Sequence, residues 1–146
     1  MSNFFYCVAA LFLIRHLYSF LFPSMSAATP LSFDEVREIT KTRSYNNIKV
    51  TLLDVRTSGE FENGSIPNAV NVPVGELEDA LKLEPAVFQR KYQFDLPTPD
   101  SPKDALLVYC KSGMRTGKAV GMLATKGYKT NLYAYQGGWD EYSQKK

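Results

Sequence analysis

Two continuous apolar runs constrain the fold of this chain more than any other feature of its sequence. They are IKVTLLDV, residues 48–55, and ALLVYC, residues 105–110. Both runs are rich in β-branched and aliphatic residues, and neither alternates strictly between apolar and polar positions, so neither can leave one face in water. Each run therefore predicts a strand in the interior of a sheet that is covered on both faces.

Helical patterns separate these strands along the chain. Ser32 with Glu35, and Thr57 with Glu60, form two capping boxes, each of which predicts the start of a short helix. Further helices are predicted in GELEDALKL, PAVFQRKYQF, GKAVGMLATKG and GGWDEYSQKK, and shorter strands in AVNVPV and TNLYAY. Because no two-residue hairpin turn is recognised, we expect parallel strands with helices on both faces of the sheet, which is an α/β fold.

The length and charge of the chain limit what it can be. Its 146 residues suffice for one compact domain, which we assign to residues 31–146. The formal net charge is +2, and lysine and arginine alternate with aspartate and glutamate. Proteins that bind nucleic acid usually carry a concentrated basic stripe, so no nucleic-acid partner is expected.

Residues 1–30 form a separate N-terminal segment, whose apolar part is FFYCVAALFLIRHLYSFLF, residues 4–22. This part is long enough to cross a bilayer, but Arg15 within it costs about 2.5–3.5 kcal/mol on insertion scales. The lack of acidic residues is also typical of a mitochondrial transit segment, and SAA at Ser26 resembles a secretory cleavage site only weakly. A targeting segment and a membrane anchor both stay open, the expected location is mitochondrial or cytoplasmic, and a membrane contact is expected only through residues 4–22. Met25 would also be a sensible start for a shorter form.

Cys110 ends the second apolar run and is followed by KSGMR, after which a helix is predicted from near Thr116. A loop above a helix N-terminus directs backbone N–H groups and the helix dipole toward its centre, which stabilises a thiolate. Lys111 and Arg115 add positive charge, and Gly113 permits a backbone conformation that side chains forbid. A cysteine at a strand end is often only part of the core. Its surroundings here favour a nucleophile with a lowered pKa.

Three motifs resemble those of the rhodanese family, the thiosulfate sulfurtransferases, in their single-domain form. They are LLDVRTSGEFENGSIPNAVNVP at residues 52–73, VYCKSGMRT at residues 108–116, and GYKTNLYAYQGGW at residues 127–139. The resemblance covers nearly all of residues 32–142. It implies the three-layer α/β fold of that family, with a central and mainly parallel sheet.

The resemblance also implies a reaction. Cys110 would take a sulfane sulfur from thiosulfate or a related persulfide donor, hold it as a persulfide, and pass it to a thiol such as glutathione, or to cyanide. Arg115 would bind the anionic donor. The other residues expected to contact the substrate are Lys111, Ser112, Gly113, Met114 and Thr116. No metal ion and no organic cofactor is implied.

Two alternative functions stay open. Cysteine phosphatases, including those of rhodanese-like fold, resemble C-x5-R, whereas four residues separate Cys110 from Arg115. The smaller loop suits a sulfur atom better than a phosphoryl group. The other alternative is a rhodanese-like module that binds partners without catalysis, although such modules commonly lack the cysteine.

The predicted domain contains neither a histidine that could deprotonate Cys110 nor a second cysteine that could accept its sulfur. The only histidine, His16, lies outside the predicted domain, and the only other cysteine, Cys7, lies in the apolar N-terminal segment. Activation of the thiol is therefore expected from loop dipoles and cations. The sulfur acceptor is expected to be external, either a small thiol or a thioredoxin-like protein.

The first motif and the last motif also contain residues to which we assign structural roles. Asp54 and Arg56 end the first predicted strand, and Arg56 is expected to pair with Glu60 or Glu62 in the following helix. Trp139 follows two glycines and is expected to belong to the core.

Overall fold

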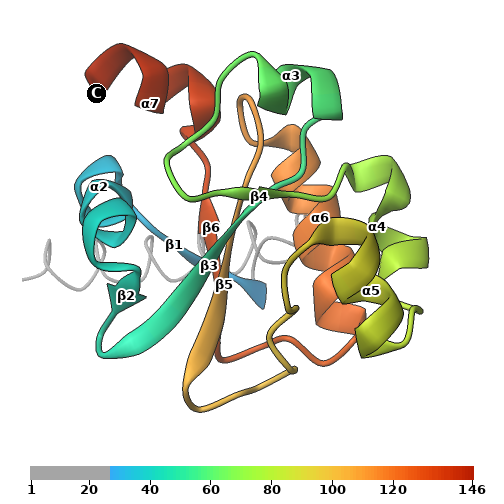
Figure 1. Cartoon of the computed structure of the whole chain (residues 1–146). Helices are drawn as coiled ribbons and strands as arrows, with labels where there is room; N and C mark the ends of the chain where they lie inside the picture. The colour runs from blue at the N-terminus through green and yellow to red at the C-terminus, as the bar shows by residue number, and fades with distance from the viewer. Residues whose placement is uncertain (1–26) are drawn as a thin grey trace, which may run out of the picture.

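The two apolar runs form neighbouring strands at the centre of the sheet in the computed structural model, which describes residues 27–146 (Figure 1). Strand β3 spans Ile48–Asp54 and strand β5 spans Asp104–Tyr109. They pair in parallel from Lys49 opposite Asp104 to Asp54 opposite Tyr109, so both strands end at the same edge of the sheet. The prediction of two interior strands is confirmed.

Four short strands complete the sheet, whose order is β1-β6-β5-β3-β2, with β4 also paired to β3. Strand β6 (Leu132–Tyr135) lies parallel to β5, and β4 (Val70–Asn71) lies parallel to β3. Strand β1 (Thr29–Pro30) lies parallel to β6 and was not predicted, since it falls within the residues assigned to the N-terminal segment. The sheet is therefore mainly parallel, as expected.

The expectation that the chain has no two-residue hairpin is wrong. Strand β2 (Ser44–Tyr45) pairs antiparallel with β3 through a turn of Asn46 and Asn47. Both asparagines have positive φ angles, 50° and 63°. Two such residues in succession make the type of hairpin turn that matches the twist of the strands, and asparagine tolerates this conformation better than most side chains.

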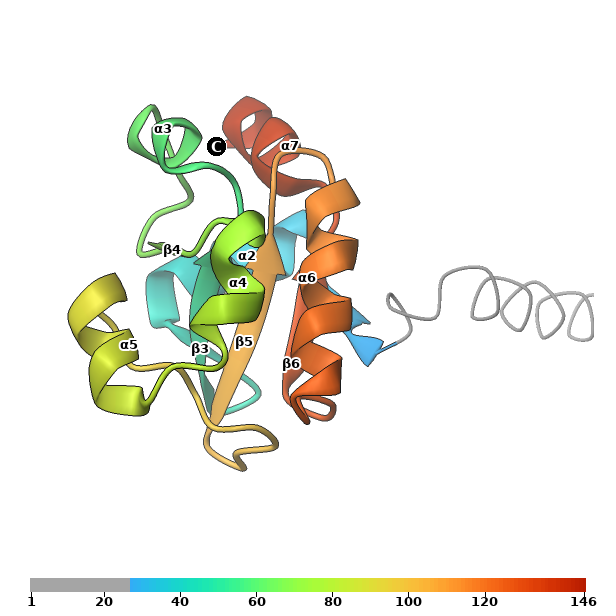
Figure 2. The same ribbon diagram turned by 90° about the vertical axis from the view of Figure 1, so that its right-hand side faces the viewer.

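Helices cover both faces of the sheet and give the three-layer fold that was expected. Different helices cover the two faces, as Figures 1 and 2 show. On the first face lie α4 (Val74–Ala80), α5 (Pro85–Tyr92) and α6 (Met114–Thr125); on the second lie α2 (Phe33–Thr42) and α7 (Gly138–Lys145). The short helix α3 (Ser58–Glu62) lies at the edge where β3 and β5 end (Figure 1).

The helix starts show how local sequence sets these elements. Both predicted capping boxes are present, at Ser32 with Glu35 and at Thr57 with Glu60. Helix α6 begins at Met114, two residues before the predicted start near Thr116, because Gly113 forms its N-cap. The first turn of α6 therefore includes residues that were predicted to belong to the loop.

Alternation along β5 divides its side chains between two hydrophobic clusters. Leu106, Val108 and Cys110 pack into the cluster under α4, α5 and α6. Leu107 and Tyr109 pack into the cluster under α2 and α7. Because β5 is packed on both faces, its end is held rigidly. The position of Cys110, which directly follows β5, is therefore well defined.

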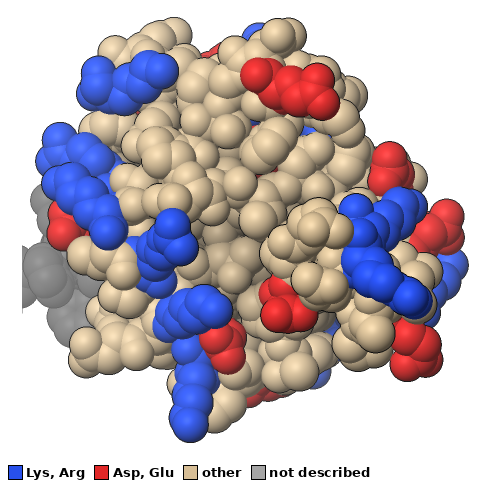
Figure 3. Space-filling model, viewed as in Figure 1, with Lys and Arg blue, Asp and Glu red and all other residues tan. Residues whose placement is uncertain are grey.

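The described helices and the surface charges can be compared with the predictions about membrane contact and charge. Across residues 27–146, no helix combines the length and the apolar composition that a bilayer span requires. The predicted anchor or targeting segment, residues 4–22, lies outside the described residues. On the face drawn in Figure 3, basic and acidic side chains both lie around the rim, and the centre is largely uncharged.

Candidate active site

The loop after β5, residues 110–115, lies at the edge of the sheet between α3 and α7 (Figure 1). We call it the cysteine loop. It joins the carboxyl end of a buried parallel strand to the N-terminus of α6, where ligands usually bind in sheets of this kind. This is the position that the sequence predicts for Cys110.

Cys110 is a free and buried cysteine, with 1% of its surface exposed. The backbone N–H of Gly113 donates a hydrogen bond of 3.0 Å to its Sγ atom. Gly113 has a φ angle of 104°, and a Cβ atom there would lie 3.1 Å from the carbonyl oxygen of Gln136. Glycine is therefore required at this position, because it alone adopts that angle freely and leaves room for the neighbouring chain.

The loop lowers the pKa of the Cys110 thiol. Burial raises this pKa, but the hydroxyl and backbone N–H of Thr116 and the backbone N–H groups of Gly113 and Ser112 lower it by more. All of these donors stabilise the charged form of the sulfur. The thiolate is consequently favoured by dipoles of the loop and of the first turn of α6, without a histidine.

The first turn of α7 holds the outer side of the cysteine loop. The backbone N–H of Trp139 donates to the carbonyl oxygen of Cys110 at 2.9 Å, and that of Asp140 donates to the carbonyl oxygen of Lys111 at 3.1 Å. These hydrogen bonds pair two carbonyl oxygens of the loop with α7, while the N–H of Gly113 donates to the sulfur. The Gly-Gly-Trp segment thus supports the loop from behind.

Each cation of the cysteine loop has an acidic partner on another helix, which the sequence patterns did not indicate. Arg115 forms two hydrogen bonds to Glu60 of α3, at 2.6 and 2.9 Å. Lys111 lies 3.5 Å from Asp140 of α7. The sequence identifies Glu60 only as part of a capping box, and no local pattern indicates contact with a residue 55 positions away.

The other three predicted substrate contacts differ in exposure. Ser112 is exposed, and Met114, the first residue of α6, is 88% exposed. Thr116 is buried beside the thiol, and its hydroxyl makes no hydrogen bond of ordinary geometry with another residue in the range 27–146. The same hydroxyl is among the groups that lower the pKa of the Cys110 thiol.

The expected pairing of Arg56 with Glu60 or Glu62 is wrong. Arg56 binds Asp54 instead, through hydrogen bonds of 2.7–3.1 Å, and also donates to the carbonyl oxygen of Gly64. Arg56 lies in the bend that follows β3, two positions after Asp54, and its backbone N–H also donates to Asp54 Oδ1 at 2.8 Å. This buried pair leaves Glu60 available to Arg115.

Trp139 is half-buried and packs against the cluster under α2 and α7 without belonging to its fully buried residues, so the prediction of a core role is met only in part. The guanidinium carbon of Arg56 lies 5.2 Å from the centre of its ring. This contact ties the end of β3 to the start of α7, and both flank the cysteine loop.

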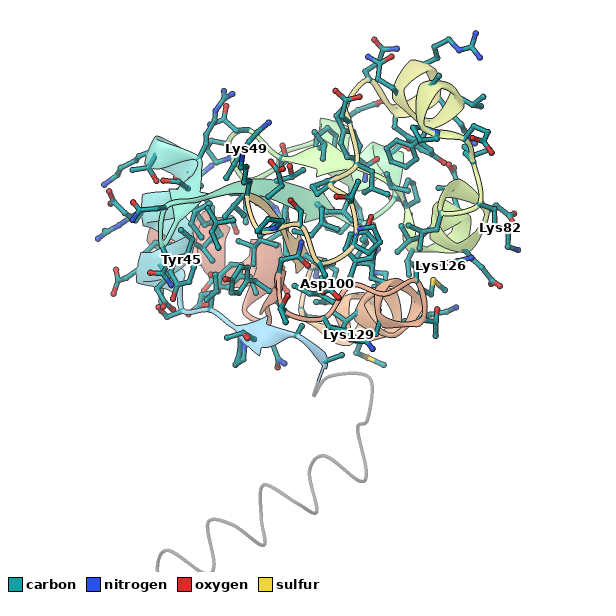
Figure 4. The ribbon with its side chains drawn as sticks, turned by 90° about the horizontal axis from the view of Figure 1, so that it is seen from below. Tyr45, Lys49, Lys82, Asp100, Lys126 and Lys129 are labelled. Atoms are coloured by element: carbon teal, nitrogen blue, oxygen red, sulfur yellow. The ribbon has the colours of Figure 1, made fainter. Side chains whose placement is uncertain are left out.

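An open groove of about 480 Å³ lies elsewhere, between the ends of α4 and α6. Figure 4 shows Lys82 and Lys126, two of the residues that line it, on the same side of the molecule. The groove is at the end of α6 opposite the cysteine loop, so it is separate from the thiol. Among residues 27–146, no three His, Cys, Asp or Glu side chains gather as a candidate metal site.

The sequence model of the rhodanese-like domain matches residues 34–145, which include the whole sheet except β1 and all of the cysteine loop. The chain belongs to this family.

Individual relatives support the same assignment. The human thiosulfate:glutathione sulfurtransferase is 34% identical over 83% of this chain and 98% of its own length. The Saccharomyces cerevisiae thiosulfate:glutathione sulfurtransferase is 38% identical over 70% of each chain. Among solved structures, a human single-domain sulfurtransferase is 32% identical, has a TM-score of 0.67, and matches 82% of this chain and 97% of its own. This rhodanese-like chain is therefore an enzyme of the sulfurtransferase class.

Proposed function

We propose that Cys110 takes the sulfane sulfur of thiosulfate and passes it to the thiol of glutathione. The main support is the buried Cys110 sulfur, which accepts a hydrogen bond from the loop and has a lowered pKa. Two relatives named thiosulfate:glutathione sulfurtransferase support this choice of donor and acceptor. The absence of another cysteine from residues 27–146 also favours an external thiol.

In the first step, the Cys110 thiolate attacks the outer sulfur of thiosulfate. The sulfur–sulfur bond of the donor breaks, its electron pair leaves with sulfite, and the enzyme keeps a persulfide. In the second step, the glutathione thiolate attacks the outer sulfur of that persulfide. The new bond forms glutathione persulfide, and the electron pair of the broken bond returns to Cys110.

The other residues of the cysteine loop take supporting roles in this proposal. Arg115 binds the sulfonate end of the donor, and Lys111 adds charge at the rim. The N–H groups of Ser112 and Gly113 stabilise negative charge on sulfur. Thr116 stabilises the Cys110 thiolate as it leaves in the second step.

Met114 is exposed at the start of α6, within the cysteine loop, and contacts the acceptor in this proposal. Its side chain is unbranched and adaptable, which suits either a small thiol or the surface of a thioredoxin-like protein. Of these two acceptors, glutathione is the one that the relatives' names support.

Intact-protein mass spectrometry tests the first step. After treatment with thiosulfate, we expect the wild-type chain to gain about 32 Da, and dithiothreitol to remove that mass, because a persulfide is reducible and a sulfinic acid of equal added mass is not. Cys110→Ser should gain nothing. A wild-type chain that never gains the reducible mass would favour a non-catalytic binding module.

Steady-state assays test the second step and the choice of acceptor. We expect sulfite release from thiosulfate to depend on glutathione and to be absent in Cys110→Ser. Turnover with a thioredoxin-like protein but not with glutathione would replace the acceptor. Hydrolysis of a phosphate ester by Cys110, without sulfur transfer, would instead favour the phosphatase alternative.

A further inference from the structure

The guanidinium of Arg115 is already bound before any donor arrives. Its two terminal nitrogens donate to the two carboxylate oxygens of Glu60, at 2.6 and 2.9 Å. This parallel geometry is the strongest arrangement available to arginine and a carboxylate. Both side chains are 32% exposed, so water screens the pair only in part.

Glu60 is held in place by its own helix. The backbone N–H and the hydroxyl of Thr57 donate to Glu60 Oε2, at 3.0 and 2.9 Å. This oxygen also accepts the shorter hydrogen bond from Arg115. The capping box of α3 therefore fixes the position of the Glu60 carboxylate. Because this carboxylate is fixed, it also holds the Arg115 guanidinium in one orientation.

The carboxylate of Glu60 stays ionised throughout the working pH range. Its pKa is lowered to about 2, chiefly by the hydrogen bonds from Arg115. Glu60 therefore carries a constant negative charge and cannot serve as the base that deprotonates an incoming thiol. Its effect on the reaction must come from its charge and from its hold on Arg115.

Glu60 leaves Arg115 able to bind an anion. A guanidinium has five N–H groups, of which Glu60 accepts hydrogen bonds from two. The remaining groups can bind oxygen atoms of a second anion. That anion, however, meets an ion pair with no net charge, because Glu60 offsets the charge of Arg115.

We propose that Glu60 is the residue that sets how tightly the cysteine loop binds the dianionic donor and its dianionic product, by holding Arg115 and offsetting its charge. This inference rests on the proposed sulfur transfer, in which thiosulfate binds and sulfite must leave. An unpaired Arg115 would bind both anions more tightly, and sulfite would then be released more slowly. Glu60 thereby keeps the loop from being blocked by its own product.

The second ion pair of the loop, between Lys111 and Asp140, is expected to affect anion binding less than the first. Lys111 and Asp140 lie 3.5 Å apart, and their side chains are 58% and 44% exposed. Pairs as exposed as this one are strongly screened and contribute little. Removal of the Glu60 carboxylate should therefore change the affinity of the loop for an anion more than removal of the Asp140 carboxylate.

Anion binding to full-length Cys110→Ser isolates this effect from turnover. Isothermal titration calorimetry with sulfite and with thiosulfate would compare that variant with its double variants carrying Glu60→Gln, Glu60→Asp or Glu62→Gln. We expect Glu60→Gln to lower the dissociation constants by about twofold to fivefold, the range expected for a partly exposed charge pair. Glu62→Gln changes the net charge equally on the same helix and should change neither constant.

Glu60→Asp separates charge from geometry. It keeps the negative charge but is one methylene shorter, so the two-point contact with Arg115 is lost. We expect no tightening in this variant. Tightening in Glu60→Asp equal to that in Glu60→Gln, or no tightening in Glu60→Gln, would overturn the proposal.

Kinetics in the Cys110 enzyme complete the test. Glu60→Gln should lower both the KM for thiosulfate and the inhibition constant of sulfite by a similar factor, whereas a merely structural role would lower kcat and leave sulfite inhibition unchanged. If the wild-type chain takes no sulfur from thiosulfate, the proposed function fails. The calorimetric comparison would still decide whether Glu60 controls anion binding at the loop.

Discussion

The backbone N–H of Trp139 donates a hydrogen bond of 2.9 Å to the carbonyl oxygen of Cys110. This contact joins the last motif of the chain to the proposed nucleophile. It requires the residue before Trp139 to pass very close to the cysteine loop, and that residue is Gly138, with a φ angle of 61°. The start of α7 and the shape of the loop are therefore set together.

Gly138→Ala should disturb the cysteine loop. A methyl group there would overlap the carbonyl oxygens of Cys110 and Lys111, and the left-handed backbone adds about 1–3 kcal/mol of strain for a residue with a side chain. We expect a similar loss in the free energy of unfolding, measured in urea. Because the N–H groups would no longer converge on the sulfur, the pKa of Cys110 should rise and alkylation by iodoacetamide at pH 7 should slow.

Gly75→Ala is the matched control for that variant. Gly75 lies in α4, and an added Cβ would meet nothing within 4 Å. Alanine should leave Cys110 alkylation unchanged and stabilise the helix by up to about 1 kcal/mol. Equal alkylation rates in Gly138→Ala and the wild type would contradict a link between α7 and the thiol.

Thr116→Val should raise the pKa of Cys110. Valine has nearly the same shape but lacks the hydroxyl that stabilises the thiolate, and burial still raises the pKa. We expect the pH profile of alkylation to move to higher pH. We also expect kcat/KM for sulfur transfer at pH 7 to fall by about tenfold, as for the loss of a polar contact to a charged group.

Thr116→Ser tests whether the hydroxyl is responsible. Serine keeps the oxygen and loses only a methyl group, so it should restore most of the wild-type pH profile. If valine and serine shift the profile equally, packing around Thr116 is the cause and the hydroxyl has no separate role.

Local patterns in the sequence predicted the fold well, for physical reasons. The runs that form β3 and β5 are apolar throughout because both of their faces are covered. The capping box of Thr57 with Glu60 involves neighbours three positions apart, so it can be recognised without a structure. The Asn46–Asn47 turn was missed because neither position contains the glycine that usually marks such hairpins.

The ion pairs around the site could not be predicted in the same way. Arg56 has Glu60 four positions away, but in the bend after β3 its guanidinium binds Asp54 instead, at 2.7 Å. The contact between Glu60 and Arg115 depends on where α3 lies relative to α6, and that placement is set by the packing of whole elements. Sequence spacing identified the charged residues of the loop but not their partners.

The contact between Glu60 and Arg115 should make the free energy of unfolding depend on pH in the acidic range. The pKa of Glu60 falls from an ordinary value near 4.5 to about 2 on folding, so the carboxylate stabilises the fold above pH 4.5 and this contribution is lost as the pH falls toward 2. We expect the wild-type urea midpoint to exceed that of Glu60→Gln at pH 7. The difference should shrink at pH 3, and a difference that is the same at both pH values would contradict the assignment.

Arg56→Met should destabilise the fold more than any of the substitutions above. The Arg56 and Asp54 side chains are 2% and 0% exposed, and methionine would leave the Asp54 carboxylate buried without its cation. Removing one partner of a buried pair costs about 3–5 kcal/mol, which urea denaturation would measure.

Arg37→Met is the matched control, because Arg37 and Asp34 form an exposed pair at 3.2 Å that should contribute about 0–1 kcal/mol. Adding Asp54→Leu to Arg56→Met should recover part of the loss by removing the unpaired charge, and equal losses in Arg56→Met and Arg37→Met would contradict the importance of the buried pair.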